Sequence, residues 1–578
     1  MNIAKKIIII LLSLGLFNKS FAEDFAPPTQ AAQVKFTEES TLTINSGVTL
    51  GTEATQNRAH INAQSDSSVT VKSGGTILSL NNAVQGADAT RLTVTNSGTI
   101  KAAGSKAINL KDNIDSTITN NSGGIIRSGT GDAISGEQDS GDVTSGNTIT
   151  NSGTIFSDDQ RAINFFSDAS TTTVTNNSSG HIYNSNTNET IKLDTSSTLT
   201  NSGKIENKNS SDNNSVLLVG DNNTVTLKDS GLVIGTIATS SGTSGNKLKI
   251  QHGVGQSYYY KTSGDFDLED LDGNQIVKGS AGSVGQGASE TIDELLSYKS
   301  MNLRNFVKRY KNSDFEDKKE GWGEGFASYL NRDGNNQNLA LEYDLYNLGA
   351  NLIYPLEKSN FLISFDTGLQ NFAKDHKIIY QNITGGVYNS NNPNFFNLET
   401  LLLSGVTLKN SKRTILTNTT SSGTLDTEGN YITYEVYSDF KKNNSILPDI
   451  GITGNFSVTP TYDEDHYFSW RNKKVGNLIF YLSDIYKIKD SELEDLSINW
   501  GLDFRNLIGD RNQIYSINGT TATYKQDSDL TRELTLRAGM NFKKEFMKNG
   551  ILSYSLDTIN TSQGTKSISG NINFQINF

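Results

Sequence analysis

The side chains that most often carry chemistry are sparse in this 578-residue sequence. Cysteine is absent, which excludes thiol catalysis, iron–sulfur clusters and cysteine-ligated zinc. A serine–histidine–aspartate site needs hydrogen-bond contact between its members, so only the stacking of distant segments could assemble one here. The five histidines are His60, His181, His252, His376 and His466.

Short motifs add little to this picture. The stretch DSGD, residues Asp139–Asp142, has part of a serine-protease nucleophile pattern but lacks the preceding glycine. A HExxH zinc motif is absent, no GDS stretch opens the mature chain, and the acidic run Ser128–Asp142 is too irregular for calcium repeats. We therefore expect no catalytic, cofactor-binding or metal-binding residues, and Ser128–Asp142 is expected to form an extended loop.

Charge and composition narrow the class of protein. The net charge is −12 and the isoelectric point lies near 5.1, which argues against nucleic acid as a partner because phosphate binding needs a basic surface. Apolar residues make up 34% of the chain, below the share of about 45–50% in globular proteins.

The first residues have the pattern of a secretory signal peptide. Lys5 and Lys6 precede an apolar run at Ile7–Phe17, and Ser20 and Ala22 occupy the small-residue positions before a cleavage site. We predict that residues 1–22 are removed by cleavage between Ala22 and Glu23. A membrane anchor is the alternative, but it needs about 20 apolar residues.

Residues 23–231 consist of a repeat of about 25 residues built around Asn-Ser-Gly turns and short β-branched runs. A repeat of this length predicts a right-handed parallel β-helix, in which stacked coils share a narrow aliphatic core, and its turn asparagines can form ladders. A disordered polar segment is the alternative. The turns begin at Asn45, Asn96, Asn121, Asn151, Asn177 and Asn201, with weaker forms at Ser73 and Ser230.

Residues 232–287 are expected to cap this solenoid. Residues 288–312 are the one convincing helix of the mature sequence, with Asp293 and Glu294 in its early turns and Lys308, Arg309 and Lys311 near its end, as the helix dipole prefers.

Residues 313–578 alternate apolar and polar side chains over about twelve strands, the pattern of a transmembrane β-barrel. In the final stretch, Ser567–Phe578, one face is apolar and the other carries only amides and hydroxyls. We expect this strand to pair with the first strand at Trp322, and we expect Asn512–Tyr524 to be one barrel strand. A soluble sandwich would also explain the alternation but would leave an exposed edge.

In this order the segments resemble a classical, type Va autotransporter of Gram-negative bacteria. The resemblance rests on WGEGFASYL from Trp322, on Tyr343–Tyr354, and on INFQINF ending at Phe578. It implies an all-β chain with a β-helical passenger, a lumenal helix and an outer-membrane barrel of about twelve antiparallel strands. It also implies a C-terminal barrel-assembly signal at Phe574, Ile576 and Phe578, and no cofactor.

The resemblance further implies the partners: outer-membrane lipid, with the Sec translocon and the barrel-assembly machinery acting during biogenesis. The protein is expected to be a monomer in the outer membrane, with its passenger on the cell surface, where a host or cell-surface ligand could bind. Some members cleave their linker between adjacent asparagines; here the candidates Asn302 and Asn305 are not adjacent, which favours an attached passenger.

Three functions remain open from the sequence. The first is a surface-displayed adhesive or structural passenger without enzymatic activity. The second is a secreted enzyme, such as a protease or an esterase, carried by the same barrel. The third is a porin-like channel, which a lumenal helix argues against.

Overall fold

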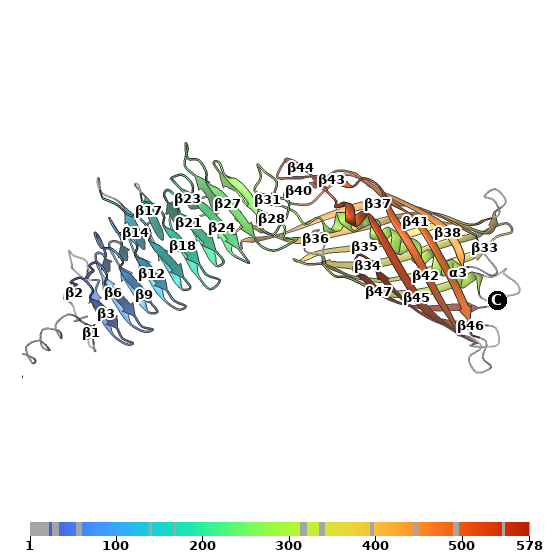
Figure 1. Ribbon diagram of the computed structural model, residues 1–578, viewed down its shortest axis with the longest axis horizontal. Coiled ribbons are helices and arrows are strands. Elements are labelled where there is room, and N and C mark those ends of the chain that lie inside the picture. The colour runs from blue at the N-terminus through green and yellow to red at the C-terminus, as the bar shows by residue number, and fades with distance from the viewer. Residues whose placement is uncertain are drawn as a thin grey trace, which may run out of the picture. The chain divides into compact units, whose positions relative to one another are not determined.

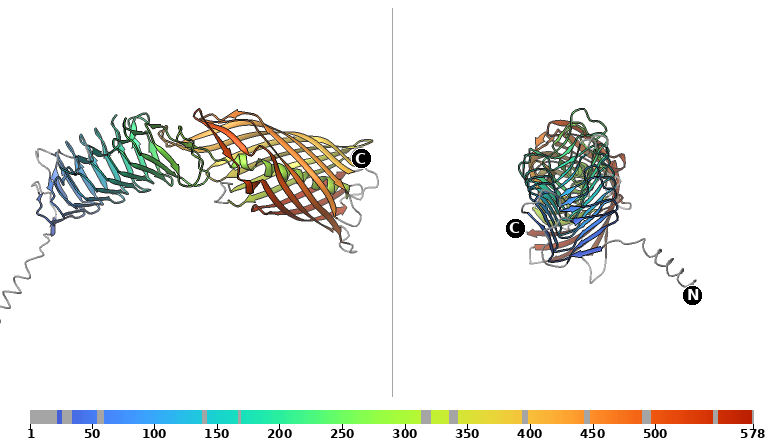
Figure 2. Two further views of the ribbon diagram at one scale, coloured as in Figure 1. Left: turned by 45° about the horizontal axis from the view of Figure 1, so that its top comes forward. Right: turned by 90° about the vertical axis from the view of Figure 1, so that its left-hand side faces the viewer.

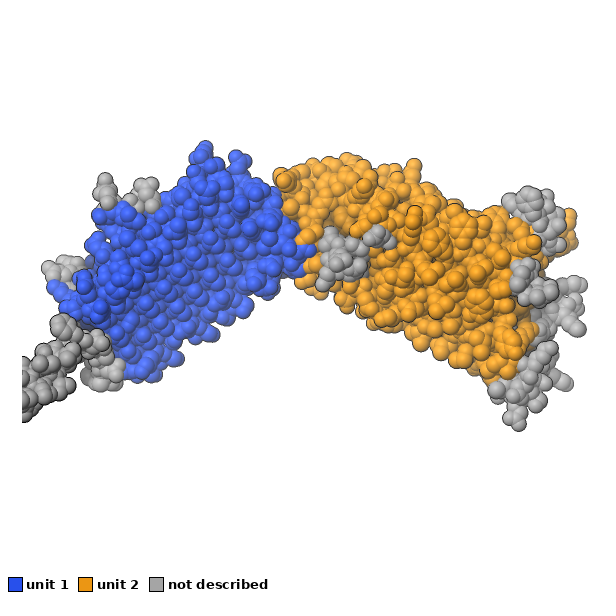
Figure 3. Space-filling view, viewed as in Figure 1, with its two compact units in different colours: residues 1–253, 259–272, 416–425 blue, residues 254–258, 273–415, 426–578 orange. Residues whose placement is uncertain are grey.

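The computed structural model describes residues 22–25, 34–53, 60–137, 142–166, 169–312, 321–334, 342–392, 398–442, 448–488, 496–545 and 550–576. These residues divide into two compact units (Figure 3). Unit 1 contains residues up to 253 together with 259–272 and 416–425, and unit 2 contains 254–258, 273–415 and 426–578.

Unit 1 is a parallel β-solenoid whose coils contribute one strand to each of three long sheets (Figure 1). Sheet A consists of β1 (Ala22–Phe25), β3 (Thr41–Ile44), β6 (Ser68–Val71), β9 (Thr93–Asn96), β12 (Thr117–Asn120), β15 (Thr148–Asn151), β18 (Thr173–Asn176), β21 (Thr198–Asn201), β24 (Thr224–Lys228), β27 (Lys247–Gln251) and β30 (Asp267–Asp270). Sheet B consists of β4 (Thr49–Thr52), β7 (Thr76–Ser79), β10 (Thr99–Ala102), β13 (Ile125–Ser128), β16 (Thr154–Ser157), β19 (His181–Asn184), β22 (Lys204–Asn207) and β25 (Leu232–Ile234). Sheet C consists of β2 (Val34–Lys35), β5 (Ile61–Asn62), β8 (Val84–Gln85), β11 (Ile108–Asn109), β14 (Ile134–Glu137), β17 (Ile163–Phe166), β20 (Ile191–Leu193), β23 (Asn214–Leu218), β26 (Thr236–Thr239) and β29 (Thr262–Ser263).

The solenoid core follows from the period-2 pattern of its strands. In sheet A the second residue of each strand points inward, and these side chains stack in register from coil to coil. Successive coils therefore share one aliphatic column, which a single coil could not bury alone. The column includes Leu42, Val69, Val94, Ile118, Ile149, Val174, Leu199 and Val225, each at most 1% exposed.

A ladder of buried asparagine amides runs beside this column. Each Nδ2 donates to the Oδ1 of the next coil at 2.8 Å, from Asn96 through Asn120, Asn151 and Asn176 to Asn201. The ladder confirms that turn asparagines stack. In the two turns that have the sequence Asn-Asn-Ser, the first asparagine, Asn120 or Asn176, is the one in the ladder. Asn121 and Asn177 instead donate to Ser97 and Ser152 of the preceding coil.

The ladder predicts a position-specific loss of stability. Replacing Asn151 by alanine removes a partner from the buried amides of Asn120 and Asn176, and each unsatisfied buried group costs about 1–3 kcal/mol. We expect amide hydrogen exchange to show a correspondingly lower opening free energy for Thr148–Asn151. The Asn177→Ala variant, which loses one partly exposed bond, is expected to lose less; equal losses in the two variants would contradict the ladder's role.

Unit 2 contains a closed antiparallel barrel of twelve strands (Figure 1). Its first strand pairs with its last, and the remaining neighbours close the circle through the pairing of β36 with β37. The strands are β32 (Trp322–Arg332), β33 (Tyr343–Pro355), β34 (Asn360–Phe372), β35 (His376–Asn392), β36 (Leu398–Thr417), β37 (Thr424–Lys442), β38 (Asp449–Thr459), β41 (Lys473–Lys487), β42 (Leu496–Gly509), β45 (Arg532–Glu545), β46 (Gly550–Thr561) and β47 (Thr565–Ile576). Two short strands, β28 (Tyr258–Tyr259) and β31 (Gly282–Ser283), extend the same sheet beyond β36.

Two details of the strand assignment differ from the sequence expectation. The segment Asn512–Tyr524 is not a barrel strand: it forms the hairpin β43 (Asn512–Ile517) and β44 (Thr520–Lys525). This hairpin belongs to a separate four-stranded sheet with β39 (Tyr462–Asp463) and β40 (Phe468–Trp470). The chain reverses at Asn518 and Gly519, whose φ angles of 46° and 83° suit a two-residue hairpin turn. The twelfth barrel strand is instead β35 (His376–Asn392), which the sequence expectation did not include.

The expected helix is present as α2 (Gly287–Glu290) and α3 (Ile292–Lys311), which lie inside the barrel (Figure 2). Among the described residues, no helix combines the length and the hydropathy that crossing a membrane requires.

Candidate functional site: the helix-filled barrel lumen

The outer surface of the barrel is apolar. Its outward side chains include Leu348 on β33, Ile383 on β35 and Ile572 on β47, with exposed fractions of 61%, 47% and 54%. Among the described residues, Ile125, Val143 and Leu271 are the only large apolar side chains before residue 322 that are similarly exposed. An apolar band around a closed barrel is the surface that hydrocarbon solvates well and water does not.

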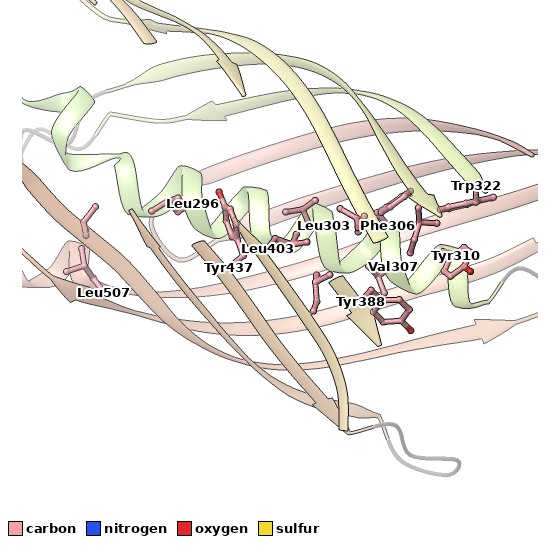
Figure 4. Packing of buried hydrophobic residues seen from close by; sticks show 14 residues of the cluster. Leu296, Leu303, Phe306, Val307, Tyr310, Trp322, Tyr388, Leu403, Tyr437 and Leu507 are labelled. Atoms are coloured by element: carbon pink, nitrogen blue, oxygen red, sulfur yellow. The ribbon is translucent and has the colours of Figure 1, made fainter. Parts of the chain in front are cut away.

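The inner wall of the barrel is polar except where α3 packs against it in two apolar clusters. The smaller cluster joins Tyr298 and Met301 of the helix to wall residues that include Leu330. In the larger cluster the helix contributes Leu296, Leu303, Phe306, Val307 and Tyr310 (Figure 4). The Phe306 ring stacks on Trp322 of β32 with centroids 5.0 Å apart, a geometry that adds to simple burial. The wall residues of this cluster are Trp322, Ile353, Leu362, Tyr388, Leu401, Leu403, Tyr437, Val475 and Leu507.

The basic half of α3 faces acidic groups of the wall. Arg309 makes two parallel hydrogen bonds to the Glu324 carboxylate, both 2.8 Å long, and a longer contact of 3.3 Å to Asp557. Arg304 pairs with Asp503 on β42. Paired guanidinium and carboxylate groups fix distance and orientation together.

The acidic half of α3 faces basic groups of the wall. Asp293 pairs with Arg505 on β42, and Glu294 pairs with Arg332 on β32. Because opposite ends of the helix meet opposite charges, the electrostatic pairing favours one axial position and one direction of α3 in the lumen. The charge distribution on the helix also agrees with its dipole.

Two small cavities lie beside the helix, and an open hollow of about 560 Å³ lies in the wall at Leu403, Tyr437 and Asn455. One cavity of about 60 Å³ is lined by Leu295, Lys299, Asn302, Phe326 and Asp366, among others. A second cavity of about 20 Å³ lies near Asn305 and Lys308. Volumes of the two small cavities hold one or a few water molecules, so the helix fills the lumen along the walls that line them.

The candidate linker-cleavage residues both lie in the regular part of α3. Asn302 lines the larger cavity, and the Oδ1 of Asn305 accepts a hydrogen bond of 2.5 Å from Arg537. The structure does not bring the two asparagines into adjacent positions, since they are three residues apart in one helix. Cleavage at either one stays a prediction.

The remaining predicted site residues fall at the ends of the sheets. Ala22 and Glu23 lie in β1, where they pair with Thr41 and Leu42, and cleavage between them stays a prediction. Phe574 and Ile576 lie in β47, where Phe574 pairs with Gly323 of β32. Phe578 lies outside the described residues, as do residues 139–141 of the DSGD stretch.

The solenoid histidines are separated, and each has its own surroundings. His60 is buried, neither ring nitrogen has a hydrogen-bond partner among the described residues, and burial lowers its pKa. His181 contacts Glu206 at 3.1 Å. His252 bonds the hydroxyl of Tyr260 at 2.7 Å and the carbonyl of Asp229 at 2.6 Å. These described contacts do not form a serine–histidine–aspartate arrangement.

Comparison with known proteins gives distant likenesses to barrels. No protein-family model and no curated protein matches the chain. Among solved structures it is similar to the translocator domain of autotransporter NalP from Neisseria meningitidis, at 11% identity over 49% of this chain and 98% of that chain, with a TM-score of 0.34. It is also similar to the transport unit of the autotransporter AIDA-I from Escherichia coli, at 11% identity over 49% of this chain and 98% of that one, with a TM-score of 0.30.

The toluene transporter TbuX from Ralstonia pickettii is similar as well, at 8% identity over 45% of this chain and 90% of that chain, with a TM-score of 0.27. Identities and TM-scores this low do not separate a secretion barrel from a transport channel. The distinction comes from this chain itself, in which a parallel β-solenoid, a lumenal helix and a closed twelve-stranded barrel follow one another. This order of parts is the one that the resemblance noted from the sequence implies.

The ion pairs of α3 predict how the plug is held. Removing one partner of a buried ion pair costs about 3–5 kcal/mol, so Arg309→Ala should lower the temperature at which the full chain in detergent micelles loses its folded electrophoretic mobility. Lys311→Ala is the matched control, because Lys311 is 29% exposed and its partner Glu399 keeps a contact of 3.1 Å with Lys441. If the two variants unfold at the same temperature, Arg309 does not hold the helix.

Proposed function

We propose that this chain is an autotransporter whose barrel anchors it in the outer membrane of a Gram-negative bacterium and displays the solenoid on the cell surface. The observation that carries the proposal is the closed barrel with an apolar exterior and a polar lumen, filled by the helix that joins it to the solenoid. Only helices and closed barrels leave no backbone group unpaired in hydrocarbon.

The direction of the helix supports this orientation. Outer-membrane barrels keep short turns on the periplasmic side and longer segments outside. The described turn between β33 and β34 is short, whereas the four-stranded sheet with β43 and β44 extends from the opposite ends of the strands. α3 ends shortly before β32 begins at the short-turn side, so the chain that precedes α2 leaves the lumen on the outside.

We further propose that the passenger is adhesive or structural and stays attached to the barrel. In support, the described solenoid histidines sit in unrelated contacts, and Asn302 and Asn305 are separate residues of one intact helix. The protein would reach the periplasm through the Sec translocon and enter the outer membrane through the barrel-assembly machinery. A host or cell-surface ligand would meet the solenoid, and one copy suffices for the barrel.

Protease treatment of intact cells tests the surface display. Added protease should release solenoid fragments while the barrel remains protected in the membrane. A solenoid that is digested only after the outer membrane has been permeabilised would contradict the display.

Planar-bilayer conductance tests the plug against a porin-like channel. Deleting residues 288–312 removes the helix that fills the lumen, so the single-channel conductance should rise well above that of the full chain. A channel whose conductance is already high with the helix present, and does not change on deletion, would favour the porin-like function.

A further inference from the structure

One face of the solenoid carries a regular threonine lattice. The first and third residues of β3, β6, β9, β12, β15, β18, β21 and β24 point outward from sheet A and pair in register along the rod. Eight strands with two such positions each give sixteen sites, of which Ser68 is the one that is not threonine. We name this surface the threonine face.

The spacing of the threonine face is set by the backbone. Neighbouring strands lie about 4.8 Å apart, and residues i and i+2 of one strand lie about 6.6 Å apart. Threonine is stiff about χ1 because it is β-branched, so its hydroxyl and methyl groups repeat with the backbone. The result is a two-dimensional array of alternating hydrogen-bonding and apolar groups with a fixed repeat.

The outward face of sheet B shows that this uniformity is not required by the fold. There the corresponding column runs through Lys101, Arg127, Phe156, Tyr183 and Glu206. Stacked coils therefore tolerate charged and aromatic residues at such positions.

Charges appear in the same columns only where the array ends. Asp24 of β1 precedes Thr43 at one end. At the other end Lys247 and Lys249 of β27 follow Thr224 and Thr226. The eight strands between them carry no charge at these sites, although Lys247 and Lys249 show that sheet A accepts lysine in the same register.

The hydroxyls of the threonine face are available to a partner outside the chain. Within the described residues, Ser68 makes a bond of 3.2 Å to Thr41, and the other fourteen lattice hydroxyls have no hydrogen bond to another protein group. Thr93 is exposed and the other lattice residues are half-buried, so their tips reach the surface.

We infer that the threonine face binds a flat crystalline surface of ice. Its two repeats are close to those at which oxygen atoms recur on prism planes of hexagonal ice, so its hydroxyls can join the lattice while its methyl groups order the waters between them. An uncharged surface fits such a partner, because a charge would hold its own hydration shell in the plane of contact. Many weak contacts act together when both surfaces are periodic.

Other occupants fit the face less well. A sugar or a protein partner would gain most from a large aromatic contact, and the threonine face has no aromatic residue. The stacked rings of Phe156 and Tyr183 lie on sheet B with centroids 4.6 Å apart. A second copy of the solenoid would find no charge or shape on this face to fix its register. The inference concerns the folded solenoid alone and does not depend on whether the barrel exports it.

The test uses the full chain in lipid nanodiscs, so that failed surface display cannot affect it. Nanodiscs carrying the protein should be enriched in a slowly grown ice hemisphere relative to empty nanodiscs. Thr150→Lys, in the middle of the threonine face, should lower this enrichment by about tenfold or more because a lattice contact is multivalent. Thr154→Lys is the matched control, because Thr154 is the first residue of β16 on sheet B and lies outside the threonine face. This variant should leave the enrichment unchanged.

Circular dichroism would show that both variants are folded. Enrichment no greater than that of empty nanodiscs, or an equal loss in both variants, would overturn the inference. Two other results, each without enrichment in ice, would also overturn it. One is binding to crystalline cellulose or chitin that Thr150→Lys weakens, and the other is pairing of two nanodiscs that Thr150→Lys weakens. Those results would assign the face to a polysaccharide or to a second copy.

Discussion

The pairing of β32 with β47 is the constraint on which the rest of the barrel depends. Ten residue pairs, from Gly323 with Phe574 to Arg332 with Thr565, close the sheet and leave it without an edge. Once every strand has two neighbours, no backbone group needs water, and the outward side chains are free to be apolar. The same closure creates a polar lumen, which is a stable interior only if it is hydrated or filled. α3 fills it, and its opposite charges at the two ends match those of the wall.

The solenoid meets the same requirement in a different way. Its strands pair with the preceding and following coils, so an edge exists only at the two ends of each sheet. The corners need polar turns, and the asparagine ladder from Asn96 to Asn201 pairs their buried amides along the rod. Both units therefore satisfy their backbone groups by strand pairing. In the solenoid the paired strands follow one another along the rod, and in the barrel they close into a ring.

Period and repeat made the solenoid, the helix and the barrel predictable from the sequence. The strand count of twelve was correct only because two errors cancelled. β35 was missed because Gln381 and Gly385 interrupt its apolar face between Ile379, Ile383 and Val387. The β43–β44 hairpin was taken for one strand although Asn518-Gly519 is a strong turn signal. The lumenal contacts could not be predicted, because partners such as Arg304 and Asp503 are 199 residues apart.

In two places the distribution of charge in this protein departs from the usual one. Charged side chains are normally exposed, and buried ones must be paired. Here the barrel lumen buries Arg309 against Glu324 with exposed fractions of 7% and 1%, while a water-facing surface of sixteen sites in the solenoid has no charge. The lumenal pairs have a structural cause, since they fix the position of the helix. Cross-strand threonine pairs stabilise a sheet, but so do aromatic pairs such as Phe156 and Tyr183 on sheet B, and sheet A accepts Lys247 and Lys249 in the same register. The uniformity of that face is therefore better explained by what it contacts than by what it stabilises.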